Sequence, residues 1–118
     1  MPDAFAKKVM DHSNHDTFHF SVECDICGKN IYSKLIRFSK SGTPASTEGK
    51  KKIYGLLWEK EYKSAFHKAV KEIVQYFSQC PMCKRWVCDS CFCICDEIDL
   101  CEECANDLGE RGLKVSQE

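Results

Sequence analysis

Apolar residues recur at a helical spacing over residues 53–79. They follow one another every three or four positions, which places them on one face of an α-helix. The sequence therefore predicts a long amphipathic helix over 53–79, and its apolar face includes the candidate interaction residues Trp58, Tyr62 and Phe66. Two alternatives stay open for this face. Either it packs against the rest of the chain, or part of it is left for a partner.

Apolar and polar residues alternate near the N-terminus, from Thr17 to Val22 and again from Ile31 to Phe38. Alternation of this kind is typical of β-strands, and the two stretches flank a Cys-x-x-Cys pair. Residues 17–38 therefore predict a β-hairpin that bends around the pair. Residues 1–16 are predicted as a tail or a short helix. The polar, lysine-rich residues 39–52 predict a flexible basic loop.

Composition changes this picture, because ten of the 118 residues are cysteine. Eight of them form four Cys-x-x-Cys pairs: Cys24 with Cys27, Cys80 with Cys83, Cys88 with Cys91, and Cys101 with Cys104. Both thiolates of such a pair can bind one metal ion, whereas four redox pairs in so short a chain are not a reasonable alternative. The sequence thus predicts two structural Zn²⁺ ions. Iron–sulfur clusters are the rival, but the closing Cys-Pro of the ferredoxin pattern is absent.

The four pairs can be combined into two sites sequentially or in an interleaved order. Residues 80–91 read C-x2-C-x4-C-x2-C, and closing one site from both middle pairs would require a very tight hairpin. Interleaving avoids this strain. It gives a first site from Cys24, Cys27, Cys88 and Cys91, and a second site from Cys80, Cys83, Cys101 and Cys104.

This spacing resembles the cross-brace of treble-clef zinc fingers, FYVE-type fingers in particular and RING-type domains more loosely. The resemblance covers residues 80–104 and the pair at 24–27. It implies a small zinc-stabilised α+β fold, with a treble-clef or zinc-ribbon-like lobe at 80–110 and a tail at 111–118. The basic cluster with which FYVE domains bind phosphoinositides is absent at residues 77–79, so the resemblance does not imply that ligand.

Cys93 and Cys95 are left over from the four pairs. On a β-strand both side chains face the same side, as two small buried residues. In a second interpretation one of them replaces a member of a nearby pair. In a third interpretation they form a third zinc site with His12, His15 and His19, which lie in a polar segment.

Charge is nearly balanced at −1, which argues against a general nucleic-acid polyelectrolyte. The balance hides an asymmetry, because residues 1–57 carry a net +3 and residues 58–118 a net −4. Between Asp89 and Glu110 there are eight acidic residues and no basic one. A contact with phosphate or with an acidic partner is therefore expected from the basic stretch 29–52, with Lys84, Arg85 and Trp86 as a further contact for a nucleic acid.

The expected function is protein–protein interaction, as an adaptor or accessory subunit. Pairs made only of cysteine favour closed sites, and no phosphate-binding loop, G-x-S-x-G or H-E-x-x-H motif is present, so an enzyme is not expected. The alternatives are a nucleic-acid-binding zinc finger protein and a RING-like ubiquitin-type ligase module. Neither a signal-peptide pattern nor a membrane-spanning stretch is found, so a reducing cytoplasmic location is expected, or a nuclear one in a eukaryote.

Overall fold

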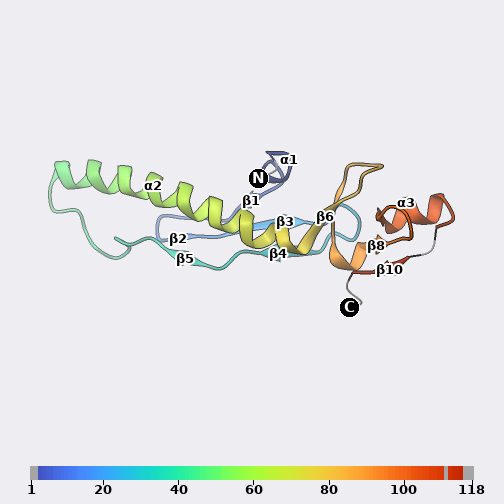
Figure 1. Ribbon diagram of the computed structural model, residues 1–118. Helices are drawn as coiled ribbons and strands as arrows, with labels where there is room; N and C mark the ends of the chain where they lie inside the picture. The colour runs from blue at the N-terminus through green and yellow to red at the C-terminus, as the bar shows by residue number, and fades with distance from the viewer. Residues whose placement is uncertain (1–2, 111, 116–118) are drawn as a thin grey trace. The chain divides into compact units, whose positions relative to one another are not determined.

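The computed structural model of the chain describes residues 3–110 and 112–115 (Figure 1). The fold is α+β, with small antiparallel sheets and one long helix. The chain divides into two compact units: unit 1 comprises residues 1–22 and 32–73, and unit 2 comprises residues 23–31 and 74–118. The first Cys-x-x-Cys pair therefore belongs to unit 2, although it lies between two parts of unit 1 in the sequence.

The longest element is helix α2 of unit 1, Glu48–Ile73 (Figure 1). It begins earlier than the predicted range 53–79, because Thr47 caps its first turn. The amide of Lys50 donates to Thr47 Oγ1 and the amide of Lys51 donates to the Thr47 carbonyl oxygen, both at 3.0 Å. The last part of the predicted loop 39–52 is therefore helical.

The helix also ends earlier than predicted. A 3-10 turn, Val74–Tyr76, follows it, and Phe77–Gln79 then forms strand β6. This strand pairs in antiparallel orientation with β7, Trp86–Cys88, so that Phe77 lies opposite Cys88. Apolar residues keep a helical spacing as far as Phe77, so their pattern alone does not mark the change from helix to strand.

The N-terminal part of the chain forms a short helix and short strands. They are α1 (Asp3–Ala6), β1 (Met10–Asp11), β2 (Thr17–Phe18), β3 (Phe20–Glu23), β4 (Asn30–Tyr32) and β5 (Ile36–Arg37). One sheet has the order β1-β3-β4, and a second pairs β2 with β5. In the second sheet Thr17 lies opposite Arg37 and Phe18 opposite Ile36. The region 17–38 thus forms two successive antiparallel ladders around the Cys-x-x-Cys turn.

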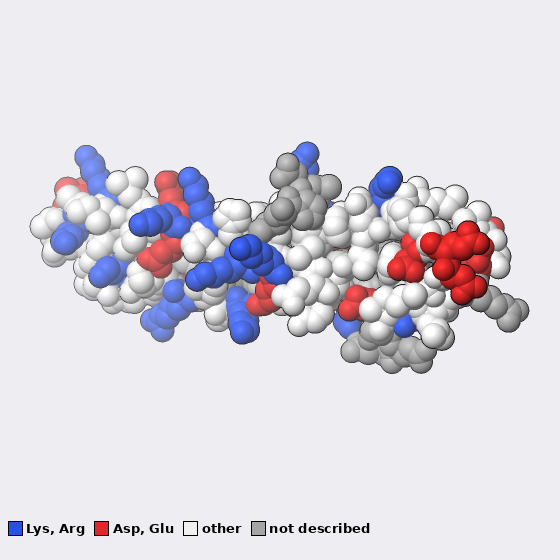
Figure 2. Space-filling model, in the orientation of Figure 1, with Lys and Arg blue, Asp and Glu red and all other residues white. Residues whose placement is uncertain are grey.

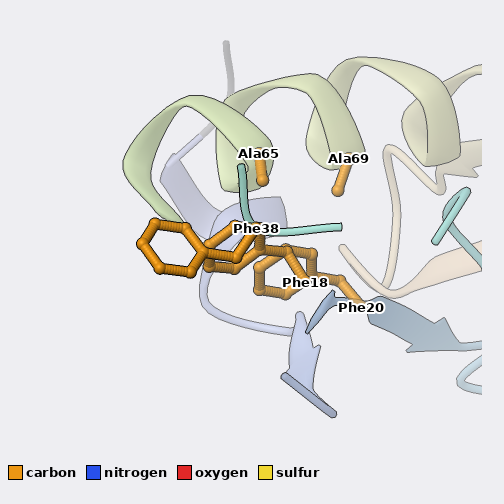
Figure 3. Packing of buried hydrophobic residues seen from close by; sticks show 5 residues of the cluster. All are labelled: Phe18, Phe20, Phe38, Ala65 and Ala69. Carbon is orange, nitrogen blue, oxygen red and sulfur yellow. The ribbon is translucent and has the colours of Figure 1, made fainter. Parts of the chain in front are cut away.

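The core of unit 1 is aromatic. Phe18, Phe20 and Phe38 are buried against Ala65 and Ala69 of α2 (Figure 3). Alanine on the inner face of a helix leaves room for large rings to approach the helix backbone closely. We call these five residues the aromatic core.

Trp58, Tyr62 and Phe66 pack against the aromatic core and are partly buried. The rings of Trp58 and Tyr62 stack with their centroids 5.2 Å apart. The ring of Phe66 meets Phe20 edge-on at a centroid distance of 5.5 Å. Of the two alternatives for the apolar face, packing against the chain accounts for most of these three side chains.

Unit 2 contains two small antiparallel sheets and a short helix. After the β6–β7 hairpin come a 3-10 turn (Asp89–Cys91), β8 (Phe92–Ile94), β9 (Leu100–Cys101), α3 (Glu102–Asp107) and β10 (Leu113–Lys114). The second sheet has the order β10-β8-β9. Two residues of the predicted tail 111–118 therefore form an edge strand. Residues 111 and 116–118 lie outside the described part of the chain.

The two units carry opposite charge. Counted over the sequence, unit 1 has twelve Lys and Arg against seven Asp and Glu, a net +5, and unit 2 has five against eleven, a net −6. Figure 2 shows basic side chains spread over unit 1 and a patch of acidic side chains near α3. None of the described helices combines the length and the hydropathy that crossing a bilayer requires.

Candidate metal centres

The sulfur atoms of eight cysteines gather into two groups of four. Within each group the sulfur atoms lie within 4.8 Å of one another, close enough to bind one metal ion. Cluster 1 contains Cys24, Cys27, Cys88 and Cys91, and cluster 2 contains Cys80, Cys83, Cys101 and Cys104. The grouping is interleaved along the chain. All eight residues belong to unit 2.

The first pair of cluster 1 sits in a tight turn, residues 24–29, which we call the first knuckle. The amide of Cys24 donates to the carbonyl oxygen of Lys29 at 2.9 Å, and the amide of Gly28 donates to the carbonyl oxygen of Cys24 at 3.1 Å. Gly28 has a φ of +75°, a conformation that glycine adopts without steric cost. The two cysteine side chains of the turn are thereby directed to the same side.

The first pair of cluster 2 sits in an equivalent turn between β6 and β7, residues 80–85, the second knuckle. The amide of Cys80 donates to the carbonyl oxygen of Arg85 at 3.0 Å, and the amide of Lys84 donates to the carbonyl oxygen of Cys80 at 2.9 Å. Lys84 therefore occupies the position that Gly28 holds in the first knuckle. Its φ of +65° costs a non-glycine residue roughly 1–2 kcal/mol.

The second pair of each cluster begins at the last residue of a strand. Cys88 ends β7, and Cys91 ends the 3-10 turn that follows it. Cys101 ends β9 and caps α3, where its Sγ accepts a hydrogen bond from the amide of Cys104 at 3.4 Å. The final ligand pair thus lies on the first turn of a helix, where the peptide dipoles favour negative charge.

Backbone amides favour the thiolate form of the first cysteine in each cluster. At Cys24 burial raises the pKa, but hydrogen bonds from backbone amides, including those of Cys88 at 3.3 Å and Ile26 at 3.4 Å, lower it overall to about 7. At Cys80 burial is likewise outweighed by backbone amides, with that of Cys101 foremost, and the pKa is lowered to about 6. Each first cysteine is therefore prepared as an anionic ligand.

The last cysteine of each cluster shows the opposite shift. Burial, followed by hydrogen bonds to neighbouring cysteines, raises the pKa of Cys104 to about 12 and also raises the pKa of Cys91. Four thiolates cannot share so small a volume without a cation, because like charges at this distance oppose ionisation. A divalent ion with high affinity for thiolate removes this conflict.

The donor set fits Zn²⁺, which binds four cysteine sulfurs in closed tetrahedral sites. All ten cysteines are free thiols, so none of the eight ligands is taken up in a disulfide. The protein therefore has two four-cysteine clusters of the composition that zinc sites use.

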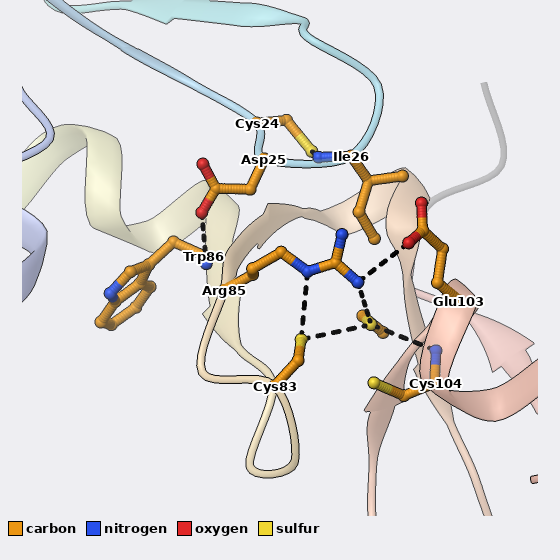
Figure 4. A network of polar contacts seen from close by, with 9 residues as sticks. Cys24, Asp25, Ile26, Cys83, Arg85, Trp86, Glu103 and Cys104 are labelled. Atoms are coloured by element: carbon orange, nitrogen blue, oxygen red, sulfur yellow. Dashed lines mark hydrogen bonds and ion pairs between the residues drawn. The ribbon is translucent and has the colours of Figure 1, made fainter. Parts of the chain in front are cut away.

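Two side chains beside the clusters tie their parts together (Figure 4). The amide of Asp25 donates to the carbonyl oxygen of Trp86 at 3.1 Å, and the amide of Trp86 donates to Asp25 Oδ2 at 3.0 Å. Asp25 thus joins the first knuckle to β7, the strand that ends at Cys88.

Arg85 has the corresponding role in cluster 2 (Figure 4). Its Nε donates to Cys83 Sγ at 3.2 Å, and its Nη2 lies 3.8 Å from Cys101 Sγ and 3.0 Å from Glu103 Oε1. Hydrogen bonds to Cys83 and then to Glu103 raise the pKa of Arg85. Burial acts to raise the pKa of the Cys83 thiol, but its hydrogen bonds with Arg85 lower the pKa overall. The equivalent cysteine of cluster 1, Cys27, has a raised pKa, with burial as the main cause.

Cys93 and Cys95 belong to neither cluster. Cys93 is buried and Cys95 is half-buried. A Cβ atom at Gly112 would come within 2.9 Å of Cys95 Sγ, so the chain passes closely over this pair. Burial raises the pKa of Cys93. Cys93 is therefore a small buried residue of β8, as the first interpretation expects, whereas Cys95 follows the strand and is only half-buried.

The histidines predicted for a third site have other surroundings, within unit 1. His12 Nε2 lies 2.7 Å from Ser21 Oγ, and the ring of His19 stacks on Tyr32 at a centroid distance of 5.4 Å. His15 is exposed. Within the range that the structure describes, the groups able to bind a metal are clusters 1 and 2, and these histidines take part in neither.

Sequence reasoning missed Arg85 and Asp25 as residues of the metal centres. For Arg85 a signal exists, since it follows Cys83 by two positions, as Lys29 follows Cys27 in the first knuckle. The equivalence of the two knuckles would have singled out both basic residues. For Asp25 no comparable signal exists, because its partner lies on a strand remote in sequence.

Comparison with protein-family models, with curated proteins and with solved structures found no match to this chain. The interpretation of the two clusters therefore rests on their geometry and on the chemistry of their donor atoms.

Proposed function

We propose that this protein is a zinc-organised protein-interaction module, in which metal ions hold unit 2 together and a groove in unit 1 binds a partner polypeptide. The observation that carries the proposal is the groove itself. It has a volume of about 700 Å³, includes the rings of Phe38, Tyr54 and Trp58 in its lining, and shares no residue with either cluster. Pockets that bind ligands typically have a volume of roughly 300–1,000 Å³ and mostly apolar walls.

The metal ions have a structural role in this proposal. Catalytic zinc keeps a position open for water, usually beside three protein ligands that include histidine or a carboxylate. Each cluster here supplies four cysteine sulfurs instead. The interleaved grouping, the two equivalent knuckles and a last pair at the start of α3 support the treble-clef cross-brace that the cysteine spacing resembles.

Glycine at position 55 of α2 supports a binding role for the groove. The walls are Ser13, Asn14, His15 and Phe38 on one side, and Tyr54, Gly55, Trp58 and Glu59 of α2 on the other. Glycine inside a helix costs roughly 1 kcal/mol relative to alanine. A Cβ atom at Gly55 would meet nothing within 4 Å, so packing of the described chain does not require glycine there. The free space above Gly55 allows a bound segment to approach the helix closely.

The surroundings of the groove favour a partner segment that carries an apolar anchor between acidic residues. Unit 1 has a net charge of +5, and Lys50, Lys51 and Lys52 are exposed on the first turn and a half of α2. Lys40 also lies at the aromatic wall, with its Nζ 6.0 Å from the centroid of the Tyr54 ring. Aromatic walls bind an apolar side chain, and exposed lysines attract carboxylates on either side of it.

The proposal is tested by selecting a display library of random peptides on the intact zinc-loaded protein. We expect enriched peptides to share an aromatic or aliphatic anchor flanked by Asp or Glu. Gly55→Leu fills the groove with a good helix former, and it should weaken their binding by about tenfold or more. Ser64→Leu, which adds the same side chain at an exposed position of α2 outside the groove, is the matched control. Failure to enrich such peptides, or equal binding by Gly55→Leu, would refute the groove as a binding site.

The basic surface of unit 1 favours nucleic-acid binding as a second candidate function. Binding to phosphates falls steeply with salt, with a slope of roughly −0.9 per phosphate contact on a logarithmic scale for duplex DNA. Labelled DNA and RNA oligonucleotides would be titrated at several salt concentrations. Strongly salt-dependent binding that Gly55→Leu leaves unchanged would replace the peptide function with this one.

A further inference from the structure

The two clusters differ in the groups beside their sulfur atoms. In cluster 2 the guanidinium of Arg85 contacts Cys83 Sγ at 3.2 Å and Cys101 Sγ at 3.8 Å, and Glu103 holds it at 3.0 Å (Figure 4). In cluster 1, within the described residues, the sulfur atoms contact backbone amides and, at 3.1 Å from Cys88 Sγ, the Ser90 hydroxyl. A permanent positive charge therefore touches the sulfurs of cluster 2.

We propose that Arg85, held by Glu103, is a positioning residue that retains the metal ion of cluster 2, so that the two clusters release metal in a fixed order, cluster 1 first. This inference rests on the proposed structural role of both metal ions.

Charge balance supports this order. Four thiolates around one divalent ion leave a formal charge of −2. The guanidinium of Arg85 places a positive charge directly against these sulfurs, with the Glu103 carboxylate bound to the guanidinium rather than to sulfur, and its N–H groups make charge-assisted hydrogen bonds to the sulfur atoms. Arg85 contacts one sulfur from each pair, Cys83 of the knuckle and Cys101 of the strand end. Cys83 or Cys101 must therefore also separate from this cation when it detaches from the metal.

The exposure of the cysteine ligands also favours release from cluster 1 first. Cys27, the second cysteine of the first knuckle, is exposed, whereas Cys83 at the equivalent position is half-buried. A competing chelator reaches the metal through an accessible ligand, and Cys27 is the most exposed of the eight ligands. Lys29 holds the position in the first knuckle that Arg85 holds in the second. A lysine ammonium is a point charge, so it cannot bridge two sulfurs as the planar guanidinium does.

The experiment begins with elemental analysis of the purified full-length chain. Two zinc ions per chain are expected. Fewer would overturn the proposed role of the clusters, and this outcome is distinct from a failure of the release order. The zinc-loaded protein is then titrated with EDTA, and amide NMR signals of Gly28 and Lys84 report on the first and second knuckle. We expect the Gly28 signal to change first and the Lys84 signal only at higher EDTA.

Three variants test the role of Arg85 and of the carboxylate that holds it. Arg85→Gln should weaken metal retention in cluster 2 by about 10–100-fold, the usual effect of removing a group that orients a metal ligand, and should bring the two signals to change together. Arg85→Lys, which keeps the charge without the fork, should restore part of the difference. Glu103→Gln should have a smaller effect in the same direction, and it remains informative if Arg85→Gln takes up no metal in cluster 2.

Lys114→Gln is the matched control. It also removes a cation paired with a carboxylate of α3, since Lys114 Nζ lies 2.7 Å from Glu102 Oε2, but no hydrogen bond joins that ammonium to a cluster sulfur in the described structure. The charge of Lys114 acts through space on Cys91 of cluster 1, so its loss cannot delay release from that cluster. Its release order should match the wild type. Simultaneous loss of both signals in the wild type, or an unchanged order in both Arg85→Gln and Glu103→Gln, would overturn the proposal.

Discussion

Unit 1 buries phenylalanine rings under a long helix, whereas unit 2 buries mainly cysteine. The large side chains that are fully buried in unit 1 are Phe5, Phe18, Phe20, Val22, Val70 and Ile73. Among the residues of unit 2 that the structure describes, seven of the twelve buried apolar ones are cysteines. Apolar burial stabilises in proportion to the area removed from water, so unit 1 has its own source of stability. A core of cysteine offers less apolar area and depends on what the sulfur atoms bind.

The strands of unit 2 are two or three residues long, too short to be stable by themselves. Structural zinc contributes roughly 10–16 kcal/mol of apparent binding free energy in finger peptides, so the two clusters are sufficient to decide whether unit 2 folds. The two units therefore combine different sources of stability in one chain. A change that removes only the metal ions, or only part of the apolar core, should therefore destabilise one unit more than the other.

Metal removal is expected to have the largest effect. Excess EDTA should unfold unit 2 and leave most of helix α2 in unit 1 intact, because the aromatic core contains no metal ligand. Amide NMR spectra would show loss of dispersed signals from 74–110 and retention of those from the second half of α2. Zinc-saturated EDTA, which has no free site to take up zinc, is the control. Complete loss of helical circular dichroism would contradict the independence of unit 1.

The converse test removes a ring from the aromatic core of unit 1 and leaves the clusters of unit 2 unchanged. Phe20 is 1% exposed and meets the rings of Tyr62 and Phe66 edge-on, at centroid distances of 5.6 and 5.5 Å. Phe20→Ala should destabilise unit 1 by about 3–5 kcal/mol, the usual cost of removing a buried phenylalanine ring. Denaturant unfolding followed by circular dichroism would measure the change. Zinc content should stay at the wild-type value, and its loss would mean that the clusters depend on the aromatic core.

The parts of this fold that the sequence predicts are those that follow from local spacing. Cys-x-x-Cys pairs set the ligand groups, and the apolar period places most of α2. The boundaries of α2 differ from the predicted ones. Thr47 caps the helix and starts it earlier. The helix ends earlier because the residues after it pair as β6 with β7, a strand that lies beyond the next turn. Asp25 was missed for a similar reason, since the turns and strands between bring Trp86 to it. Arg85 could have been found from its place two positions after Cys83, which matches Lys29 after Cys27.

A smaller effect is expected within unit 2, where the two knuckles differ at one position. Gly28 and Lys84 both have positive φ, at +75° and +65°. Lys84→Gly should relieve the strain of the second knuckle and stabilise the protein by about 1 kcal/mol, whereas Gly28→Ala should introduce that strain and destabilise it by a similar amount. Thermal unfolding of the zinc-loaded variants would measure both. Shifts of the same sign would show that the knuckles are not equivalent.

The smallest expected effect is a pH dependence specific to unit 1. The hydroxyl of Tyr62 donates to Asp11 Oδ2 at 2.7 Å, and burial together with this carboxylate raises the pKa of Tyr62 to about 12. A raised pKa means that the contribution of Tyr62 to stability is complete below pH 10, its ordinary value, and is lost as the pH rises towards 12. For Asp11 burial acts to raise the pKa, but the hydrogen bonds from Tyr62 and Ser13 lower it overall, so its contribution is lost only as the pH falls below about 4.

Absorbance titration of tyrosinate should show Asp11→Asn lowering the pKa of Tyr62 towards 10, with Tyr62→Phe identifying which of the four tyrosines is observed. An unchanged titration would show that burial alone sets the pKa of Tyr62.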